Sequence, residues 1–140
     1  MPFQNAPAPL AQALAARGFE APTSVQAAIL ADDAKGRDLL VSARTGSGKT
    51  VAFGLSLADT LLNGADRCGP SGAPLALVIA PTRELALQVR SELEWLYAKT
   101  GARIVSCVGG MEPRTEARHL SAGCHIVVGT PGRLCDHLKR

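Results

Sequence analysis

Apolar residues along this chain follow two patterns, one with the period of an α-helix and one of short continuous runs. A continuous run predicts a strand buried on both faces, and the helical period predicts an amphipathic helix. The segment 83–99 shows the helical period clearly, with an apolar stripe made by Leu85, Val89, Leu93 and Leu96. The expected helices are 7–17, a short helix capped by Thr23 or Ser24, 49–62, 83–99, 112–121 and one that opens at Pro131; the expected strands are 38–43, 75–80, 104–108 and 125–128.

The order of these elements predicts the fold class. Apolar strands that alternate with helices indicate an α/β fold with a parallel sheet and helices on both faces. In such a sheet, ligands bind at the carboxyl ends of the strands. The loops expected at that edge are 44–50, 81–84, 109–110 and 129–133. Because these loops share one edge, we expect the functional residues to lie in them.

Residues 43–50 carry the most informative motif, Ala-Arg-Thr-Gly-Ser-Gly-Lys-Thr. The run follows the GxxxxGK[ST] pattern of a phosphate-binding loop, with alanine in place of the first glycine. Gly46 and Gly48 allow successive N–H groups to point into one concavity, which attracts a polyphosphate. Lys49 can reach the β- and γ-phosphates, and the Thr50 hydroxyl can bind Mg²⁺. A flexible turn is the plainer interpretation, but a turn does not require Lys-Thr between an apolar strand and a helix.

Four other segments fit either a binding role or an ordinary structural role. The Gln26 amide could pair with the edge of an adenine, or it could be an exposed helix residue. Residues 81–85 and 130–133 could hold a nucleic-acid phosphate at a helix start, or they could only cap a helix. The glycines at 109–110 could admit a nucleic-acid backbone, or they could make a turn.

Composition narrows the class of protein. The 140 residues fit one globular domain, and we expect neither a membrane span nor a secretory signal. The four cysteines form no CxxC pair, so we expect reduced, buried thiols and a cytoplasmic setting. Residues 1–100 carry nine basic and nine acidic side chains, whereas residues 101–140 carry six and three. This excess of basic side chains in residues 101–140 indicates a polyanion partner or simply a slightly basic solvated helix.

Taken together, these segments resemble the DEAD-box family of ATP-dependent RNA helicases. Residues 18–26, Gly-Phe-x-x-Pro-Thr-x-Val-Gln, look like the family's Q motif, and residues 43–50 look like motif I. Pro-Thr-Arg-Glu-Leu at 81–85 is similar to motif Ia. The glycines at 109–110 resemble the GG doublet, and Thr-Pro-Gly-Arg at 130–133 resembles motif Ib. The motifs occur in the family's order over nearly the whole chain.

The resemblance implies an incomplete RecA-like P-loop NTPase domain and a role for each matching residue. Gln26 would read the adenine, Phe3 would stack on it, Thr50 would serve Mg²⁺, and Lys49 and Thr50 would be the catalytic residues. The residues implied to bind ATP are Phe3, Phe19, Gln26, Arg44, Thr45, Gly46, Ser47, Gly48, Lys49 and Thr50. The residues implied to grip the RNA backbone, without reading its sequence, are Thr82, Arg83, Gly110, Thr130 and Arg133.

The chain departs from the family pattern in three ways. Arg44 stands where motif I commonly has Gln, and Phe3 lies closer to Gly18 than is usual. The chain also ends at Arg140 without the Asp-Glu-Ala-Asp motif, the Ser-Ala-Thr motif or the second RecA-like domain expected in the full-length protein. We therefore expect residues 1–140 alone to bind nucleotide weakly and hydrolyse almost none. We also expect an unpaired apolar strand edge, with marginal stability or self-association through it.

The resemblance divides the chain into an N-terminal helical segment with the Q motif, residues 1–30, and the N-terminal part of a RecA-like ATP-binding domain, residues 31–140. It implies an RNA helicase that couples ATP binding and hydrolysis to local unwinding of RNA duplexes. A DNA translocase or another P-loop ATPase is a second hypothesis, which the residues at 18–26 and 81–85 disfavour. A non-catalytic RNA-binding adaptor is a third.

Overall fold

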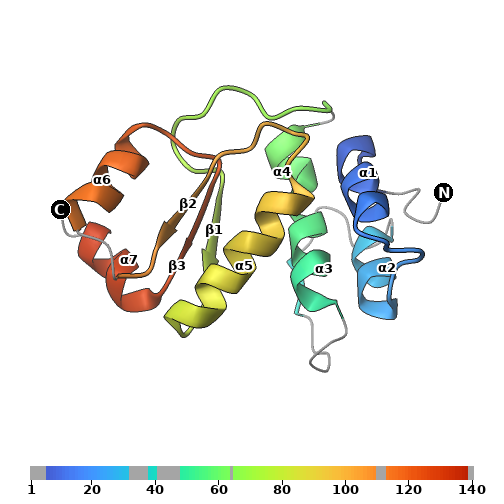
Figure 1. The fold of residues 1–140 in the computed structure, drawn as a ribbon, viewed down its shortest axis with the longest axis horizontal. Helices are drawn as coiled ribbons and strands as arrows, with labels where there is room; N and C mark the ends of the chain where they lie inside the picture. The colour runs from blue at the N-terminus through green and yellow to red at the C-terminus, as the bar shows by residue number, and fades with distance from the viewer. Residues whose placement is uncertain (1–5, 32–37, 41–47, 64, 110–112, 139–140) are drawn as a thin grey trace.

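The computed structural model of this chain describes residues 6–31, 38–40, 48–63, 65–109 and 113–138 (Figure 1). Three parallel strands and seven helices are found within these residues. The helices are α1 (Ala8–Ala16), α2 (Ser24–Leu30), α3 (Lys49–Ser56), α4 (Ala58–Leu62), α5 (Arg83–Leu96), α6 (Pro113–Ser121) and α7 (Pro131–Leu138), and the strands are β1 (Ala76–Ile79), β2 (Ile104–Cys107) and β3 (Ile126–Gly129).

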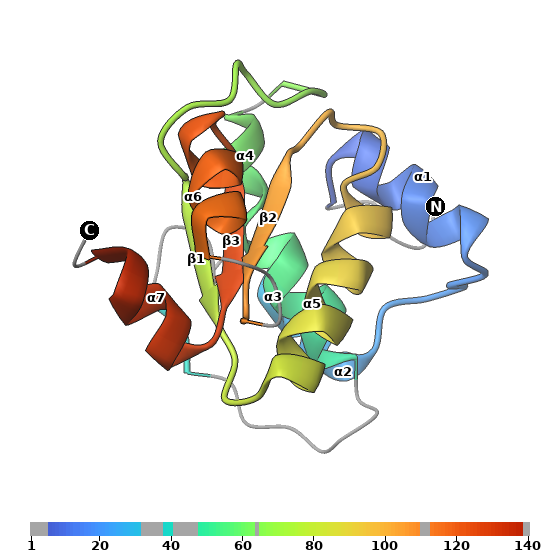
Figure 2. The same ribbon diagram turned by 60° about the vertical axis from the view of Figure 1, so that its left-hand side comes forward.

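The strands form one sheet in the order β1-β3-β2, with β3 in the centre. Ile126 and Val128 of β3 join a core cluster that contains apolar residues of α1, α3, α4 and α5. Val127 of β3 belongs to a second cluster, with residues of β2 and the partly buried Leu120 of α6 and Leu134 of α7. Figures 1 and 2 show α5 on one side of the strands and α6 and α7 on the other. The predicted α/β fold, a parallel sheet with helices on both faces, is confirmed.

The first helix ends as its sequence predicts. Gly18 donates its N–H to Ala15 O, and the N–H of Phe19 returns to Leu14 O, both at 3.0 Å. These two bonds satisfy carbonyl groups at the helix end in the manner of a glycine C-cap. The Phe19 ring then lies 5.7 Å from the Trp95 ring, which anchors the end of α1 to α5.

Helix α3 packs closely on α5 because residue 54 is a glycine. A Cβ atom at Gly54 would lie 2.8 Å from Leu96 Cδ2 and 3.0 Å from Leu93 Cδ2. The Tyr97 hydroxyl donates a 2.5 Å hydrogen bond to Gly54 O. Burial is the main cause that raises the pKa of Tyr97 above its ordinary value, so the phenol stays protonated as the donor.

Three expectations from the apolar pattern need correction. The helix expected over 49–62 is two helices, α3 and α4, and the Ser56 hydroxyl at the break donates to Phe53 O at 2.6 Å. The strand expected over 38–43 is not seen at 38–40, where Leu40 is fully exposed; residues 41–43 lie outside the described residues. Strand β1 is not buried on both faces, because α6 and α7 cover β2 and β3 and leave Leu77 and Ile79 about 60% exposed.

Candidate functional site

The predicted loops gather at the carboxyl edge of the sheet. Because all three strands are parallel, the segments after β1, β2 and β3 leave the sheet at the same edge. Helix α5 begins directly after β1, and α7 begins directly after β3. Figure 1 places the first residues of α3 at this same lower end of the molecule. The structure thus brings the described parts of the four predicted loops to one end of the fold.

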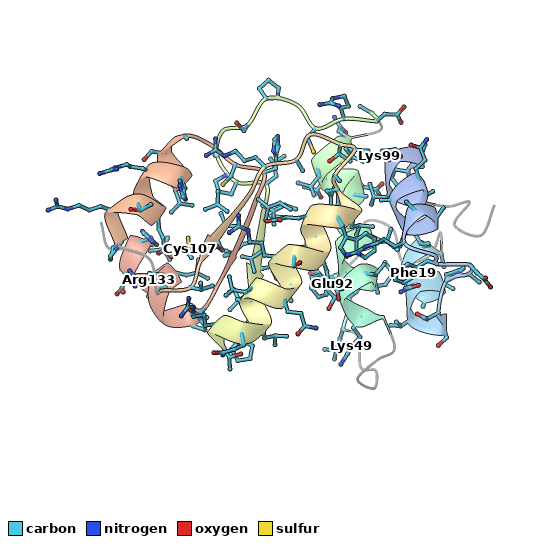
Figure 3. The ribbon with its side chains drawn as sticks, viewed as in Figure 1. Phe19, Lys49, Glu92, Lys99, Cys107 and Arg133 are labelled. Atoms are coloured by element: carbon cyan, nitrogen blue, oxygen red, sulfur yellow. The ribbon has the colours of Figure 1, made fainter. Side chains whose placement is uncertain are left out.

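The start of α3 has the geometry that the phosphate-loop motif requires. Gly48 precedes the helix in a left-handed conformation, with φ of 83°. A Cβ atom there would lie 2.3 Å from the Gln26 amide nitrogen, so both conformation and space demand glycine. Lys49 and Thr50 form the first turn, and Figure 3 shows Lys49 at the lower end of α3. Residues 41–47, with Arg44, Thr45, Gly46 and Ser47, lie outside the described residues.

Gln26 is fully buried and joins α2 to the start of α3. Its Oε1 accepts a hydrogen bond from Thr23 N at 3.0 Å, and Thr23 Oγ1 accepts from Gln26 N at 3.3 Å. This reciprocal pair is a capping box, which explains why α2 begins at Ser24. The Gln26 Nε2 donates to Gly48 O at 3.3 Å, across 22 residues of sequence. These contacts use one of two amide hydrogens and one of two lone pairs on the amide oxygen.

Of the two phenylalanines predicted at the nucleotide site, the structure describes only Phe19. Phe19 is half-buried against Trp95, and the Arg17 guanidinium lies over the same indole, 4.8 Å from its centroid. In this arrangement Phe19 packs between α1 and α5, and Figure 3 shows it away from Lys49. Phe3 lies outside the described residues.

Thr82 and Arg83 stand exposed at the start of α5. The Thr82 hydroxyl accepts a hydrogen bond from Leu85 N at 3.2 Å and so caps the helix. Glu84 in the first turn complements the helix dipole. The sequence analysis left helix capping as one of two possible roles for this segment, and the structure shows the cap. The amino end of the 14-residue helix α5 also faces solvent at the carboxyl edge of the sheet.

The segments after β2 and β3 lie against each other. Thr130 N donates to Cys107 O at 3.2 Å, so the residue that follows β3 is linked to the last residue of β2. Gly109 has φ of 79°, and a Cβ atom on it would lie 3.3 Å from the Nη2 atom of Arg133. Arg133, from the first turn of α7, therefore lies over the turn that follows β2. Gly110 lies outside the described residues.

The sequence analysis missed Glu116, which contacts this arginine, and His137, which contacts Glu116. Glu116 of α6 is 1% exposed and lies 3.5 Å from Arg133 Nε and 2.9 Å from His137 Nε2. Helix α6 is mostly polar, and a glutamate in such a helix ordinarily faces water. No local pattern distinguishes this residue, because its partners come from residues 108, 133 and 137.

Comparison with known proteins decides which family has this arrangement. The sequence pattern of the DEAD/DEAH box helicases matches residues 23–140, which is most of the chain. The chain belongs to the DEAD/DEAH box helicase family. The recognition from motifs is therefore confirmed, and the chain carries the amino-terminal motifs of that family.

Individual relatives agree with the family. The chain is 46% identical over 134 residues to the ATP-dependent RNA helicase DeaD of Klebsiella pneumoniae, covering 95% of this chain and 20% of that protein. It is 39% identical to eukaryotic initiation factor 4A-8 of Nicotiana tabacum, covering 94% of this chain and 30% of that protein. The chain thus spans about a fifth to a third of the length of these relatives.

Solved DEAD-box structures share the fold. The RNA helicase Prp28 of Chaetomium thermophilum bound to ADP superposes with a TM-score of 0.83 at 37% identity, over 99% of this chain and 34% of that protein. A DEAD box protein from Methanococcus jannaschii gives a TM-score of 0.82 at 34% identity, over 99% of this chain and 36% of that protein. Among the described residues, no helix is long and apolar enough to cross a membrane.

Proposed function

We propose that this chain is the ATP-binding and RNA-binding portion of an ATP-dependent RNA helicase. The observation that carries the proposal is the bond between Gln26 Nε2 and Gly48 O, which joins the Q motif to the end of the phosphate loop. A P-loop ATPase of another kind does not need this amide. The whole protein would couple ATP binding and hydrolysis to local unwinding of RNA.

In this proposal the start of α3 holds the polyphosphate. Lys49 would bind the β- and γ-phosphates, and the Thr50 hydroxyl would hold Mg²⁺. The donor set fits, because an ammonium, a hydroxyl and the N–H groups of a helix start lie together in the first turn. Gln26 would read the adenine with the amide groups left over from its two bonds, and Phe3 would stack on the base. Arg44 to Ser47 would complete the loop.

The exposed starts of α5 and α7 would hold the RNA. Thr82 and Arg83 would bind one phosphate group, and Gly110, Thr130 and Arg133 would bind the neighbouring backbone. Such contacts position the nucleic acid without reading its bases, as a general unwinding enzyme requires.

We further propose residues 1–30 as the Q-motif segment and residues 31–140 as the first part of the ATP-binding domain. Hydrolysis requires carboxylates that orient the attacking water and cations that stabilise the transition state. A second RecA-like domain and an acidic motif of the full-length protein would supply them, so residues 1–140 alone would hydrolyse almost no ATP. The described cysteines are all free thiols, which suits a reducing cytoplasm.

The substitution Lys49→Ala in the full-length protein tests the proposal. We expect it to weaken ATP binding and abolish RNA-stimulated ATP hydrolysis, because the ammonium contacts the phosphates. Lys99→Ala is the matched control, since Lys99 is also exposed but lies at the opposite end of the molecule (Figure 3). If RNA binding were indifferent both to ATP and to Lys49→Ala, a non-catalytic RNA-binding adaptor would be the better assignment.

A further inference from the structure

The carboxylate of Glu116 connects two segments that are far apart in sequence. Its Oε2 accepts a hydrogen bond from Val108 N at 3.1 Å, in the turn that follows β2. Its Oε1 faces α7, where it lies 2.9 Å from His137 Nε2 and 3.5 Å from Arg133 Nε. One buried carboxylate therefore ties both the first and the last turn of α7 to the turn beside Gly109.

The contact constrains the direction of the Arg133 side chain. Guanidinium has five N–H groups in a fixed plane, and the contact through Nε turns one edge of that plane toward Glu116. The Nη2 atom then lies beside Gly109, where a Cβ atom would be 3.3 Å away. The side chain of Arg133 is 19% exposed, so the arginine is held in place without being sealed from solvent.

A negative charge at this place is unexpected for a surface that binds RNA. Coulomb repulsion between a carboxylate and a nearby phosphate weakens binding unless the carboxylate acts through a cation. The free-energy cost of burying the carboxylate is offset by its hydrogen bonds and by the ion pair with the arginine. Glu116 therefore has two uses: it bonds to Val108 N and His137, and it fixes the position of Arg133.

Metal binding is the competing interpretation of this cluster. The ligand atoms of Cys107, Glu116 and His137 all lie within 4.8 Å of one another. However, Glu116 already faces three nitrogen groups, one of them a guanidinium that would repel a cation. Burial is the main cause that raises the pKa of Cys107 to about 11, which disfavours the thiolate that a metal needs. The contacts favour an ion pair.

We propose that Glu116 is a positioning residue for RNA binding, which fixes the Arg133 guanidinium against the turn at Val108 and Gly109 so that both contact one stretch of backbone. This inference rests on the proposed function, and it adds a residue that never touches the RNA. Glu116 acts through Arg133: it fixes the position of the guanidinium, and its own charge does not contribute to RNA binding.

The substitution Glu116→Gln separates the two halves of the contact. Glutamine keeps an oxygen for Val108 N, but its NH₂ group then faces the Nε–H donor of Arg133. The assay is fluorescence anisotropy with a labelled single-stranded oligouridylate, the full-length protein and a non-hydrolysable ATP analogue, repeated over a salt series. Glu94→Gln is the matched control, because Glu94 also pairs with an arginine but is exposed on α5.

The expected change in RNA affinity is opposite in sign to the change that loss of a negative charge alone would cause. Removing an acidic residue should strengthen RNA binding if only charge matters, and Glu94→Gln should leave it unchanged or slightly tighter. We expect Glu116→Gln to weaken binding about five- to tenfold and lower the slope of log affinity against log salt by about 1, and we expect the same change in slope for Arg133→Gln. Glu116→Gln combined with Arg133→Gln should bind no more weakly than Arg133→Gln alone, because both act on one contact.

Several outcomes would overturn the inference. If Glu116→Gln bound RNA as tightly as the wild type or more tightly, Glu116 would be structural only. Arg133→Lys provides a test that keeps Glu116: if lysine supported wild-type affinity, charge alone would suffice and positioning would be refuted. Wild-type affinity in Arg133→Gln would instead refute the RNA contact assigned to Arg133, and absence of RNA binding by the wild type would refute the proposed function itself.

Discussion

Gln26 gives the sharpest test of how the Q-motif segment is attached to the nucleotide site. Replacing it with alanine removes the acceptor of Thr23 N and the donor to Gly48 O, both of which are bonds of a fully buried side chain. Each buried polar group left unpaired costs about 1–3 kcal/mol, so losing both bonds in Gln26→Ala should destabilise the fold by about 2–6 kcal/mol. That is a large part of the ~5–15 kcal/mol that stabilises a typical domain.

The substitution Gln26→Glu adds a dependence on pH whose sign follows from the same contacts. A carboxylate keeps the acceptor for Thr23 N but places a second oxygen against Gly48 O, and burial also disfavours its charge. Both effects raise the pKa of the introduced carboxyl above its unfolded value of about 4.3. Its protonated form can donate to Gly48 O, so the variant should be most stable below that unfolded pKa and lose stability as pH rises through the folded pKa.

Thermal unfolding followed by circular dichroism at several pH values measures both effects. Gln88→Ala and Gln88→Glu are the matched controls, because Gln88 is an exposed glutamine of α5. At about 4 °C per kcal/mol, Gln26→Ala should lower the melting temperature by about 8–24 °C. The reasoning is wrong if Gln26→Ala melts within a few degrees of Gln88→Ala, or if Gln26→Glu and Gln88→Glu show the same pH dependence.

Two further predictions concern the packing of this chain. Gly54→Leu should destabilise the fold by about 1–3 kcal/mol or more, because its Cβ would meet Leu93 and Leu96 within 3.0 Å; denaturant unfolding checks this, and a stabilised variant would contradict it. The exposed Leu77 and Ile79 of β1 should make residues 1–140 self-associate, and Leu77→Lys should reduce this in sedimentation experiments; a wild type that stays monomeric at high concentration would refute the idea.

The sequence predicted most of the fold because most of its signals are local. The apolar stripe of residues 83–99 and the glycine at 18 describe a helix and a helix end that need no distant partner. The alternation of strands and helices was enough for the parallel sheet. The break between α3 and α4 was missed because Ser56 bonds to Phe53 in the middle of an apolar pattern that continues across it.

Burial of strands was predicted less well, since it depends on which elements lie above each strand. β1 (Ala-Leu-Val-Ile) is as free of polar side chains as β3 (Ile-Val-Val-Gly), yet β3 is buried at all four positions and β1 alternates between partly covered and exposed. The difference arises because β1 lies at the edge of the sheet that α6 and α7 leave uncovered, whereas these helices cover β3 and the other edge strand, β2. A pattern of residue types carries no information about strand order, so the exposed face of β1 could not be read from it.

The candidate site shows the same division between local and distant causes. Motifs located Gly48, Thr82 and Arg133, since each marks a loop or a helix start in its own segment. The partners of Glu116 lie 8 to 21 residues away in the sequence, and Glu116 lies in a helix that is mostly polar. Only the packing of α6 against β2 and α7 turns that glutamate into a buried partner of an arginine.

The packing of α3 on α5 bears on how a nucleotide could affect RNA binding. The first turn of α3 holds Lys49 and Thr50, and the first turn of α5 holds Arg83 beside its cap, Thr82. Gly54 brings α3 against Leu93 and Leu96, and the Tyr97 hydroxyl bonds directly to Gly54 O. The carboxyl-terminal part of α5 thus packs directly on α3, while its first turn carries Arg83. One helix therefore both contacts the helix proposed to bind the nucleotide and presents a proposed RNA contact.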